Sequence, residues 1–254
     1  MSQSVGIVIP AFRPDVDRLR AYVDAVREEL DPETVRIEVD DPGSAVATAL
    51  AEVPATVNVS PYRRGKGAAV TDGFEALETD VLAFADADGS TPPAELAAVV
   101  DAVVGGSADL AVGSRRHPDA EITSHQTFAR RFLGDGFAWL ARRLLAVDLY
   151  DYQCGAKALT RPAWEGVRGH LYEAGFAWDV ELVAMAGALE LDVAEVPITW
   201  EDRPGSTVSP VRTSIRLARA LLTARHRAKQ ISDSRVHNAI AATREDPTAL
   251  VDRQ

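Results

Sequence analysis

Two aspartates one residue apart, Asp86 and Asp88, follow a run of five apolar residues at 81–85. An uninterrupted apolar run of this length is typical of a buried strand. In open α/β sheets, ligands bind just beyond the carboxyl ends of the strands, where these two carboxylates stand. On an extended backbone the two side chains point the same way, and a cation would relieve their repulsion. Carboxylate oxygens suit Mg²⁺ or Mn²⁺, so the pattern indicates a divalent-cation site. The alternative is a plain turn, which Asp, Gly and Ser also favour.

A basic, glycine-containing segment at 61–67 precedes a predicted helix at about 67–77. Backbone amides at a helix N-terminus, together with Lys66, could hold phosphate. The spacing is not that of a P-loop, because GxxxxGK[ST] is absent. A solvated turn is the alternative interpretation.

The elements that position these residues alternate between strand and helix over the first 115 residues. This alternation predicts a parallel sheet with helices on both faces, and the polar strand ends should meet at one edge. Those ends are Phe12-Arg13, Asp40-Asp41, Asp86–Asp88 and Ser114-Arg115. The expected strands are 5–9, 35–39, 55–59, 81–85 and 108–112, and the expected helices are 16–30, 44–52, 67–77 and 92–104.

The second half begins with a long helical pattern at 123–147, followed by a compact polar segment at 151–157, a further helix and a late strand at 191–200. Asp179 stands within the apolar run 176–182, where an unpaired carboxylate would be costly, so it needs a partner or a chemical task. Capping of the helix that follows is the alternative for Asp179.

A basic helical pattern covers residues 211–228, and no acidic residue occurs between Arg203 and Ser232. Its basic and apolar residues fall on opposite faces, which is typical of a helix that binds a membrane surface or a partner. The alternative is a helix packed on the core with a solvated arginine face. From about Ile231 the sequence is polar and without pattern, which predicts a mobile tail.

The composition bounds the class of protein. Of the 254 residues 46% are hydrophobic, enough for a core, and the net charge of −11 does not favour binding to nucleic acid. An acidic chain with only three lysines is typical of a salt-rich cytosol, although a GC-rich genome gives a similar bias. The single cysteine, Cys154, excludes an intrachain disulfide. We see neither a signal peptide nor a membrane span, and expect a cytoplasmic protein that meets a membrane only from its surface.

Taken in order, these motifs resemble family 2 glycosyltransferases of the GT-A fold, a Rossmann-like α/β fold, and more closely the dolichyl-phosphate glucosyltransferases. The resemblance covers about residues 5–228 and predicts one catalytic domain at 1–230, with a nucleotide-sugar half (1–115), an acceptor half (116–207), the basic helix (208–230) and a tail (231–254). The motifs are VIPAF at 8–12, GKG at 65–67, DADG at 86–89, GSR at 113–115, DYQCGAK at 151–157, FAWDVEL at 176–182, and EVPITW at 195–200 with the following GSTV.

This resemblance implies inverting transfer of a hexose from a nucleoside-diphosphate sugar to dolichyl or polyprenyl phosphate. UDP-glucose is the favoured donor, and a GDP-mannose-using mannosyltransferase is the alternative. An acceptor phosphate is already anionic at pH 7 and needs little help from a general base. The implied activity serves protein glycosylation or assembly of surface glycans, at the cytoplasmic face of the membrane.

The resemblance also assigns roles to residues. It places Pro10, Phe12, Asp41, Lys66 and Asp86 around the nucleotide. It places Asp86 and Asp88 on a divalent cation, Mg²⁺ or Mn²⁺. The acceptor phosphate is assigned to Arg115, Arg131 and Lys157, with Arg130 equally able to take the place of Arg131. The catalytic group comprises Asp88, Asp179 and Asp151, of which the last two orient the sugar or a cation.

Two departures from the family pattern matter. Pro42 interrupts the usual Asp-Asp-Gly-Ser, so Asp40 competes with Asp41 for the nucleotide role. Relatives often carry transmembrane helices after the catalytic domain, and we expect helix 211–228 or a partner to dock this chain instead. A remote alternative is a haloacid-dehalogenase-like phosphatase, in which Asp86 would attack phosphate. That class needs a later GDxxxD loop, and Gly134-Asp135-Gly136 lacks the second aspartate.

Overall fold

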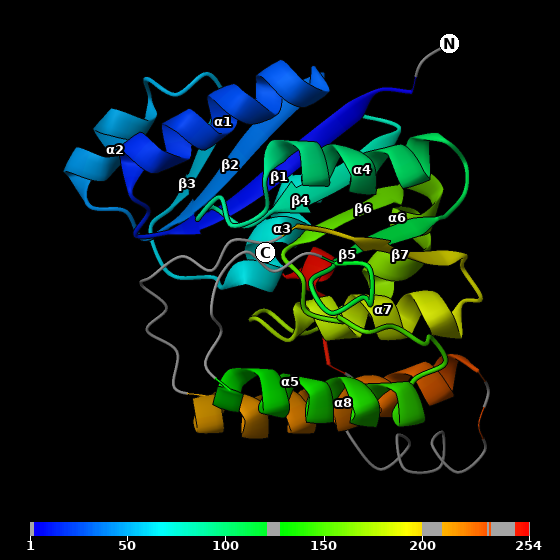
Figure 1. Ribbon diagram of the computed structural model, residues 1–254. Coiled ribbons are helices and arrows are strands. Elements are labelled where there is room, and N and C mark those ends of the chain that lie inside the picture. Colours follow the sequence, from blue (N-terminus) through cyan, green and yellow to red (C-terminus); the bar gives the residue numbers. More distant parts are fainter. Residues whose placement is uncertain (1–2, 121–127, 200–209, 233, 235–246, 254) are drawn as a thin grey trace.

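The computed structural model describes residues 3–120, 128–199, 210–232, 234 and 247–253, with the backbone alone described at 128–133 and 210–215. A single seven-stranded sheet forms the centre of the molecule (Figure 1), in the order β3-β2-β1-β4-β6-β5-β7. Every neighbouring pair is parallel except the two that involve β6, which runs antiparallel between β4 and β5. The strands are β1 (Val5–Phe12), β2 (Thr34–Asp40), β3 (Thr56–Ser60), β4 (Val81–Ala85), β5 (Leu110–Ser114), β6 (Ala156–Thr160) and β7 (Val193–Pro197).

Helices cover both faces of the sheet, as the alternating pattern predicts. In Figure 1, α1, α2 and α4 lie on one face and α3, α6 and α7 on the other, while α5 and α8 lie side by side beyond α7. The helices are α1 (Val16–Leu30), α2 (Ser44–Leu50), α3 (Lys66–Glu75), α4 (Pro93–Val104), α5 (Phe128–Leu144), α6 (Arg161–Val167), α7 (Trp178–Ala188) and α8 (Pro210–Ile231), with 3₁₀ turns at Arg168–His170 and Leu250–Asp252.

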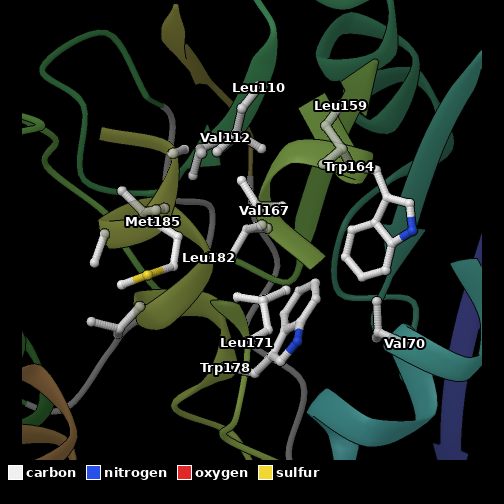
Figure 2. Packing of buried hydrophobic residues seen from close by; sticks show 14 of the residues in the cluster. Val70, Leu110, Val112, Leu159, Trp164, Val167, Leu171, Trp178, Leu182 and Met185 are labelled. Carbon is white, nitrogen blue, oxygen red and sulfur yellow. The ribbon is translucent and has the colours of Figure 1, made fainter. Parts of the chain in front are cut away.

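The strand β4 is buried on both faces and divides the core in two. Leu82 and Phe84 pack toward α3, α6 and α7, whereas Val81, Ala83 and Ala85 pack toward α1 and α4. Successive side chains of a strand alternate between faces, so a strand covered on both sides must be apolar throughout. Figure 2 shows the α6/α7 side of this core, where Trp164 and Trp178 are fully buried.

The sequence prediction misses β6. The polar segment 151–157 was expected to lead directly into a helix, but residues 156–160 form a central strand between β4 and β5. Strand β6 is short, and the charged Lys157 interrupts its apolar residues, so it lacks the continuous apolar run typical of a buried strand. Lys157 can nevertheless lie at 0% exposure because its ammonium group has buried partners.

The prediction of a mobile tail from residue 231 is wrong for residues 247–253. The Leu250 N–H donates to the Leu171 carbonyl oxygen at 2.8 Å, and Ala249 and Leu250 are buried. Helix α8 continues to Ile231.

The basic helix packs on the body of the protein. Leu217, Leu221 and Ala224 of α8 are buried, and α8 contacts α7 and α5. The apolar Leu222 of the same helix is nevertheless 57% exposed. None of the described helices has the length and apolar character that crossing a bilayer requires.

Candidate functional site

The carboxyl ends of β1, β2, β4 and β5 carry the four polar segments singled out in the sequence. Asp86 and Asp88 follow β4 in a turn in which the Ser90 N–H donates to Asp88 Oδ1 at 2.9 Å and Gly89 has φ +63°. The two interpretations of this segment are therefore compatible, because the turn itself presents the carboxylates. Asp88 is exposed and Asp86 is partly exposed, so both can reach a ligand.

Gly155, in the loop before β6, contacts both the backbone and the carboxylate of Asp86. The Asp86 N–H donates to the Gly155 carbonyl oxygen at 3.0 Å. A Cβ atom on Gly155 would stand 1.9 Å from Asp86 Oδ2, so a side chain there would displace the carboxylate. The glycine of the 151–157 motif is thus explained by its close approach to Asp86.

Lys66 joins Asp86 to Asp179. Its Nζ lies 2.9 Å from Asp86 Oδ1 and 3.0 Å from Asp179 Oδ2. Burial alone would lower the pKa of the Lys66 ammonium, but Asp179 and Asp86 raise that pKa above its ordinary value. Burial raises the pKa of the Asp86 carboxyl, and the nearby charges of Asp179 and Asp88 add to the rise, while Lys66 opposes it.

Asp179 has partners and is not a helix cap. Its Oδ1 accepts from Lys157 Nζ at 2.8 Å, while Oδ2 faces Lys66. Ala177 is the N-cap residue of α7, and no side chain caps this end, so the capping alternative is wrong. Trp178 holds the start of α7 against β4, because its buried ring packs edge-on against Phe84 with centroids 5.6 Å apart.

Lys157 does not lie where an acceptor phosphate could reach it. Its ammonium is fully buried between Asp179 Oδ1 and the Cys154 carbonyl oxygen, which accepts at 2.7 Å. This placement contradicts the prediction that Lys157 binds the acceptor phosphate. The side chain points into the protein and neutralises Asp179 there, and no local pattern around residue 157 indicates this distant partner.

The second acidic loop separates into a buried and an exposed aspartate. Asp40 is buried, and it accepts from Arg64 Nε and from the Gly65 N–H, each at 2.8 Å. Asp41 is exposed with φ +47°, which presents its carboxylate at the surface beside the loop. Asp41 is therefore the one available to a ligand, while Asp40 holds the Gly65 loop. Sequence reasoning did not find the role of Arg64, which also binds Glu38 and Asp72.

The end of β1 adds an aromatic surface. The guanidinium of Arg63 lies over the Phe12 ring, 4.0 Å from its centroid. Pro10 and Phe12 are both half-buried, and Pro10 pairs in register with Glu38 of β2. Arg13 also lies over this ring, 5.1 Å from its centroid, so a flat ligand that stacks on Phe12 would take the place of one of these guanidinium groups.

On the other side of β4, Arg115 and Asp151 form a bidentate ion pair. Arg115 Nε donates to Asp151 Oδ2 at 2.7 Å and Nη2 donates to Oδ1 at 3.1 Å. Burial would raise the pKa of Asp151, but the charge and hydrogen bonds of Arg115 lower that pKa below its ordinary value. Glu195 of β7 holds this segment, since its carboxylate accepts from the N–H groups of Tyr150 and Asp151 at 2.8 Å. Glu195 belongs to a motif that the sequence singled out, but its role was not predicted.

The side chains of Arg130 and Arg131 lie outside the described residues, although both residues belong to α5. Helix α5 is joined to the end of β5 by the ion pair of Arg116 with Asp135, at 2.5 Å. This ion pair ties α5, the helix that carries the predicted acceptor residues, to the residue that follows Arg115.

Two hard oxygen donors, Asp86 and Asp88, suit a divalent cation such as Mg²⁺ or Mn²⁺. In the part of the chain that the structure describes, no group of three or more His, Cys, Asp or Glu side chains could hold a metal ion. A cation at this pair would take its further oxygens from a bound ligand or water, as Mg²⁺ commonly does with substrate phosphates. Asp86 and Asp88 therefore fit a divalent cation whose remaining ligands come from substrate or water.

Comparison with known proteins shows the family of this chain. Residues 6–159 match the family described as glycosyl transferase family 2. Glycosyltransferase AglD of Haloferax volcanii is 30% identical over 228 residues, covering 86% of this chain and 36% of that protein. The mouse dolichyl-phosphate beta-glucosyltransferase is 34% identical over 173 residues, covering 65% of this chain and 52% of that protein. This chain thus spans about half or less of the length of these two relatives.

A solved structure shares the fold. The glucosyl-3-phosphoglycerate synthase of Mycobacterium tuberculosis, solved with Mn²⁺, UDP and phosphoglyceric acid, superposes with a TM-score of 0.67. The two sequences are 15% identical, and the match covers 88% of this chain and 78% of that one. The prediction of a GT-A fold is confirmed.

Proposed function

Because the chain belongs to glycosyl transferase family 2, we propose that it transfers a hexose from a nucleoside-diphosphate sugar, UDP-glucose being favoured, to dolichyl or another polyprenyl phosphate. The observation that carries this proposal is the convergence of Asp86, Asp88 and Lys66 at the end of β4, with Arg115 following β5. The phosphatase alternative is wrong, since residues 6–159, which include Asp86, match glycosyl transferase family 2.

The donor lies across the ends of β1, β2 and β4. Phe12 stacks on the base, Asp41 accepts from a base N–H or a ribose hydroxyl, and Lys66 contacts the diphosphate. Asp86 and Asp88 hold a divalent cation that neutralises the leaving diphosphate when it is bound. The names of the dolichyl-phosphate glucosyltransferases favour glucose over the GDP-mannose alternative.

The acceptor phosphate approaches Arg115, and an arginine of α5 completes its binding site. A guanidinium suits bidentate recognition of phosphate oxygens. Asp151 keeps the Arg115 side chain in a fixed orientation. Since the attacking phosphate oxygen is already anionic, no residue has to remove a proton. Asp179 is buried and paired with Lys157 and Lys66, so its role is to position the Lys66 ammonium.

The test is transfer itself. The protein is incubated with Mn²⁺, a polyprenyl phosphate and each of UDP-glucose, GDP-mannose and related donors, and the lipid product is identified by mass. We expect a phosphate-linked hexose, and we expect Asp88→Asn to abolish it while Asp101→Asn, an exposed change on α4, does not. Full transfer by Asp88→Asn would exclude the cation role of Asp88. Release of inorganic phosphate without a lipid product would exclude transfer.

The acceptor is a membrane lipid, so the enzyme docks on a bilayer surface, and the outward face of α8 is suited to this. Arg216 and Arg219 are exposed there, with the 57% exposed Leu222 beside them. Together with Thr223 and Arg227 the two arginines line a hollow of about 250 Å³ against Tyr172 and Glu181. Basic residues interspersed with an exposed leucine favour an anionic lipid surface.

Vesicle co-sedimentation tests the docking. Because Leu221 and Ala224 are part of the core, deleting α8 would unfold the protein, and surface substitutions are the better probe. We expect Arg216→Gln with Arg219→Gln to weaken binding to anionic vesicles, whereas Arg18→Gln with Arg27→Gln on α1 leaves it unchanged. Equal binding by both double variants would exclude docking through α8.

A further inference from the structure

Asp86 already has a cationic partner within the protein. The Lys66 ammonium lies 2.9 Å from Asp86 Oδ1, and the Lys66 side chain is only 7% exposed. It also faces the Phe84 ring, 5.0 Å from the centroid. A divalent cation that uses Asp86 must therefore either share this carboxylate with Lys66 or displace the ammonium.

Lys66 can leave Asp86 without becoming unpaired, because its ammonium group also pairs with Asp179 Oδ2 at 3.0 Å. Asp179 in turn keeps a second cation when Lys66 moves, since Lys157 binds its Oδ1 at 2.8 Å. Lys157 donates a hydrogen bond to the Cys154 carbonyl oxygen and is fully buried, so we expect it to stay in place. Breaking a buried ion pair is costly when it strands a charge, and this arrangement avoids that cost.

A diphosphate gives Lys66 a better partner than Asp86. Its oxygens are anionic and reach the same edge of the sheet, and a lysine ammonium binds phosphate as a point charge. Once Lys66 turns to the diphosphate, the Oδ1 oxygen of Asp86 is open to a divalent cation. The cation in turn removes the repulsion between Asp86, Asp88 and the diphosphate.

We propose that Lys66 is a displaceable internal counter-ion of Asp86, through which binding of the divalent cation and binding of the nucleoside diphosphate strengthen each other. The inference rests on the proposed function, because it requires a diphosphate at this edge. Coupling between two sites is reciprocal, so each ligand changes the affinity of the other by the same factor, roughly 5- to 150-fold in typical cases.

Direct binding of Mn²⁺, followed by titration calorimetry or by the spin-resonance signal of the free ion, tests the proposal without turnover. In the unaltered protein we expect UDP or GDP to raise the Mn²⁺ affinity at least about fivefold. Lys66→Met removes the internal counter-ion. We expect this variant to bind Mn²⁺ alone more tightly than the unaltered protein, and to lose most of the enhancement by nucleotide.

Lys229→Met is the matched control, since it removes the same charge from the exposed end of α8, and we expect it to leave both values unchanged. Lys66→Arg keeps a charge at the position and guards against misfolding of the methionine variant, and we expect it to retain part of the coupling. Unaltered Mn²⁺ affinity in Lys66→Met, or undiminished enhancement by nucleotide, would overturn the role of Lys66.

The two proposals fail in different ways. If neither UDP nor GDP binds the unaltered protein in the presence of Mn²⁺, the proposed function fails together with the coupling. If a nucleotide and Mn²⁺ both bind, but neither changes the affinity of the other, only the coupling is overturned.

Discussion

Arg115 binds both carboxylate oxygens of Asp151, with Nε 2.7 Å from Oδ2 and Nη2 3.1 Å from Oδ1. The carboxylate is only 3% exposed and the guanidinium is 24% exposed. The buried carboxylate of Asp151 therefore fixes the orientation of Arg115, the arginine that we assign to the acceptor phosphate.

Asp151→Asn is expected to destabilise the fold and to weaken acceptor binding. An amide cannot accept two charge-assisted hydrogen bonds, and removing one partner of a buried pair costs about 3 kcal/mol or somewhat less, given the partial exposure of Arg115. Chemical unfolding gives the stability, and transfer at varied acceptor concentration gives KM. Unchanged KM for the lipid with unchanged KM for the donor would contradict the role of Arg115. Asp148→Asn, an exposed change in the same loop, is the control.

The same pair makes stability depend on pH. The pKa of Asp151 is lowered in the folded protein, so its contribution is fully present above the unfolded carboxyl pKa of roughly 4 and is lost as the pH falls through the folded value. Unfolding free energies measured from about pH 2 to pH 6 should fall more steeply with acid in the unaltered protein than in Asp151→Asn. Parallel curves would show that Asp151 does not carry this dependence.

Gly155→Ala should damage the cation site while sparing the fold. The added methyl group would meet Asp86 Oδ2 at 1.9 Å, so the carboxylate must leave its present position. We expect Mn²⁺ binding and transfer to fall at least about tenfold, which is about 1.4 kcal/mol. Gly166→Ala is the control, since nothing lies within 4 Å of its Cβ, and in helix α6 alanine should stabilise by up to ~1 kcal/mol.

Lys157→Met tests the buried support of Asp179. Methionine is similar in length and leaves Asp179 with Lys66 as its only ammonium partner among the described residues. We expect a loss of about 2 kcal/mol, less than for a pair left wholly unpaired, and a fall in kcat that exceeds the change in KM for the acceptor. A change confined to acceptor KM would instead favour the phosphate role that the buried position contradicts. Chemical unfolding and initial rates provide the two measurements.

The sequence was most informative where local patterns and the fold agree. The alternation of strands and helices in the first half and the apolar run of β4 ending at Asp86 are local signals, and the structure has these elements within a few residues. The exposed position of Asp41 agrees with its choice over Asp40, although its contact with the nucleotide stays a prediction.

The failures share a physical cause. Strand β6 depends on pairing with β4 and β5, and the burial of Lys157 depends on Asp179 of α7, which only the folded chain brings near. The hydrogen bond from the Leu250 N–H to the Leu171 carbonyl oxygen likewise joins segments that are far apart in the sequence. Leu222 fits the apolar side of a helical wheel, but a wheel does not show which neighbours cover that side.

The antiparallel strand β6 also constrains how this chain can be made. Its backbone completes hydrogen bonding for both β4 and β5, so a ribosome that has delivered only the first 115 residues exposes two central strands with unpaired edges. The nascent sheet must wait until residues 156–160 leave the exit tunnel before Asp86 gains its bond to Gly155. The catalytic edge is therefore a late product of synthesis, and until then the partial sheet is the species most exposed to aggregation.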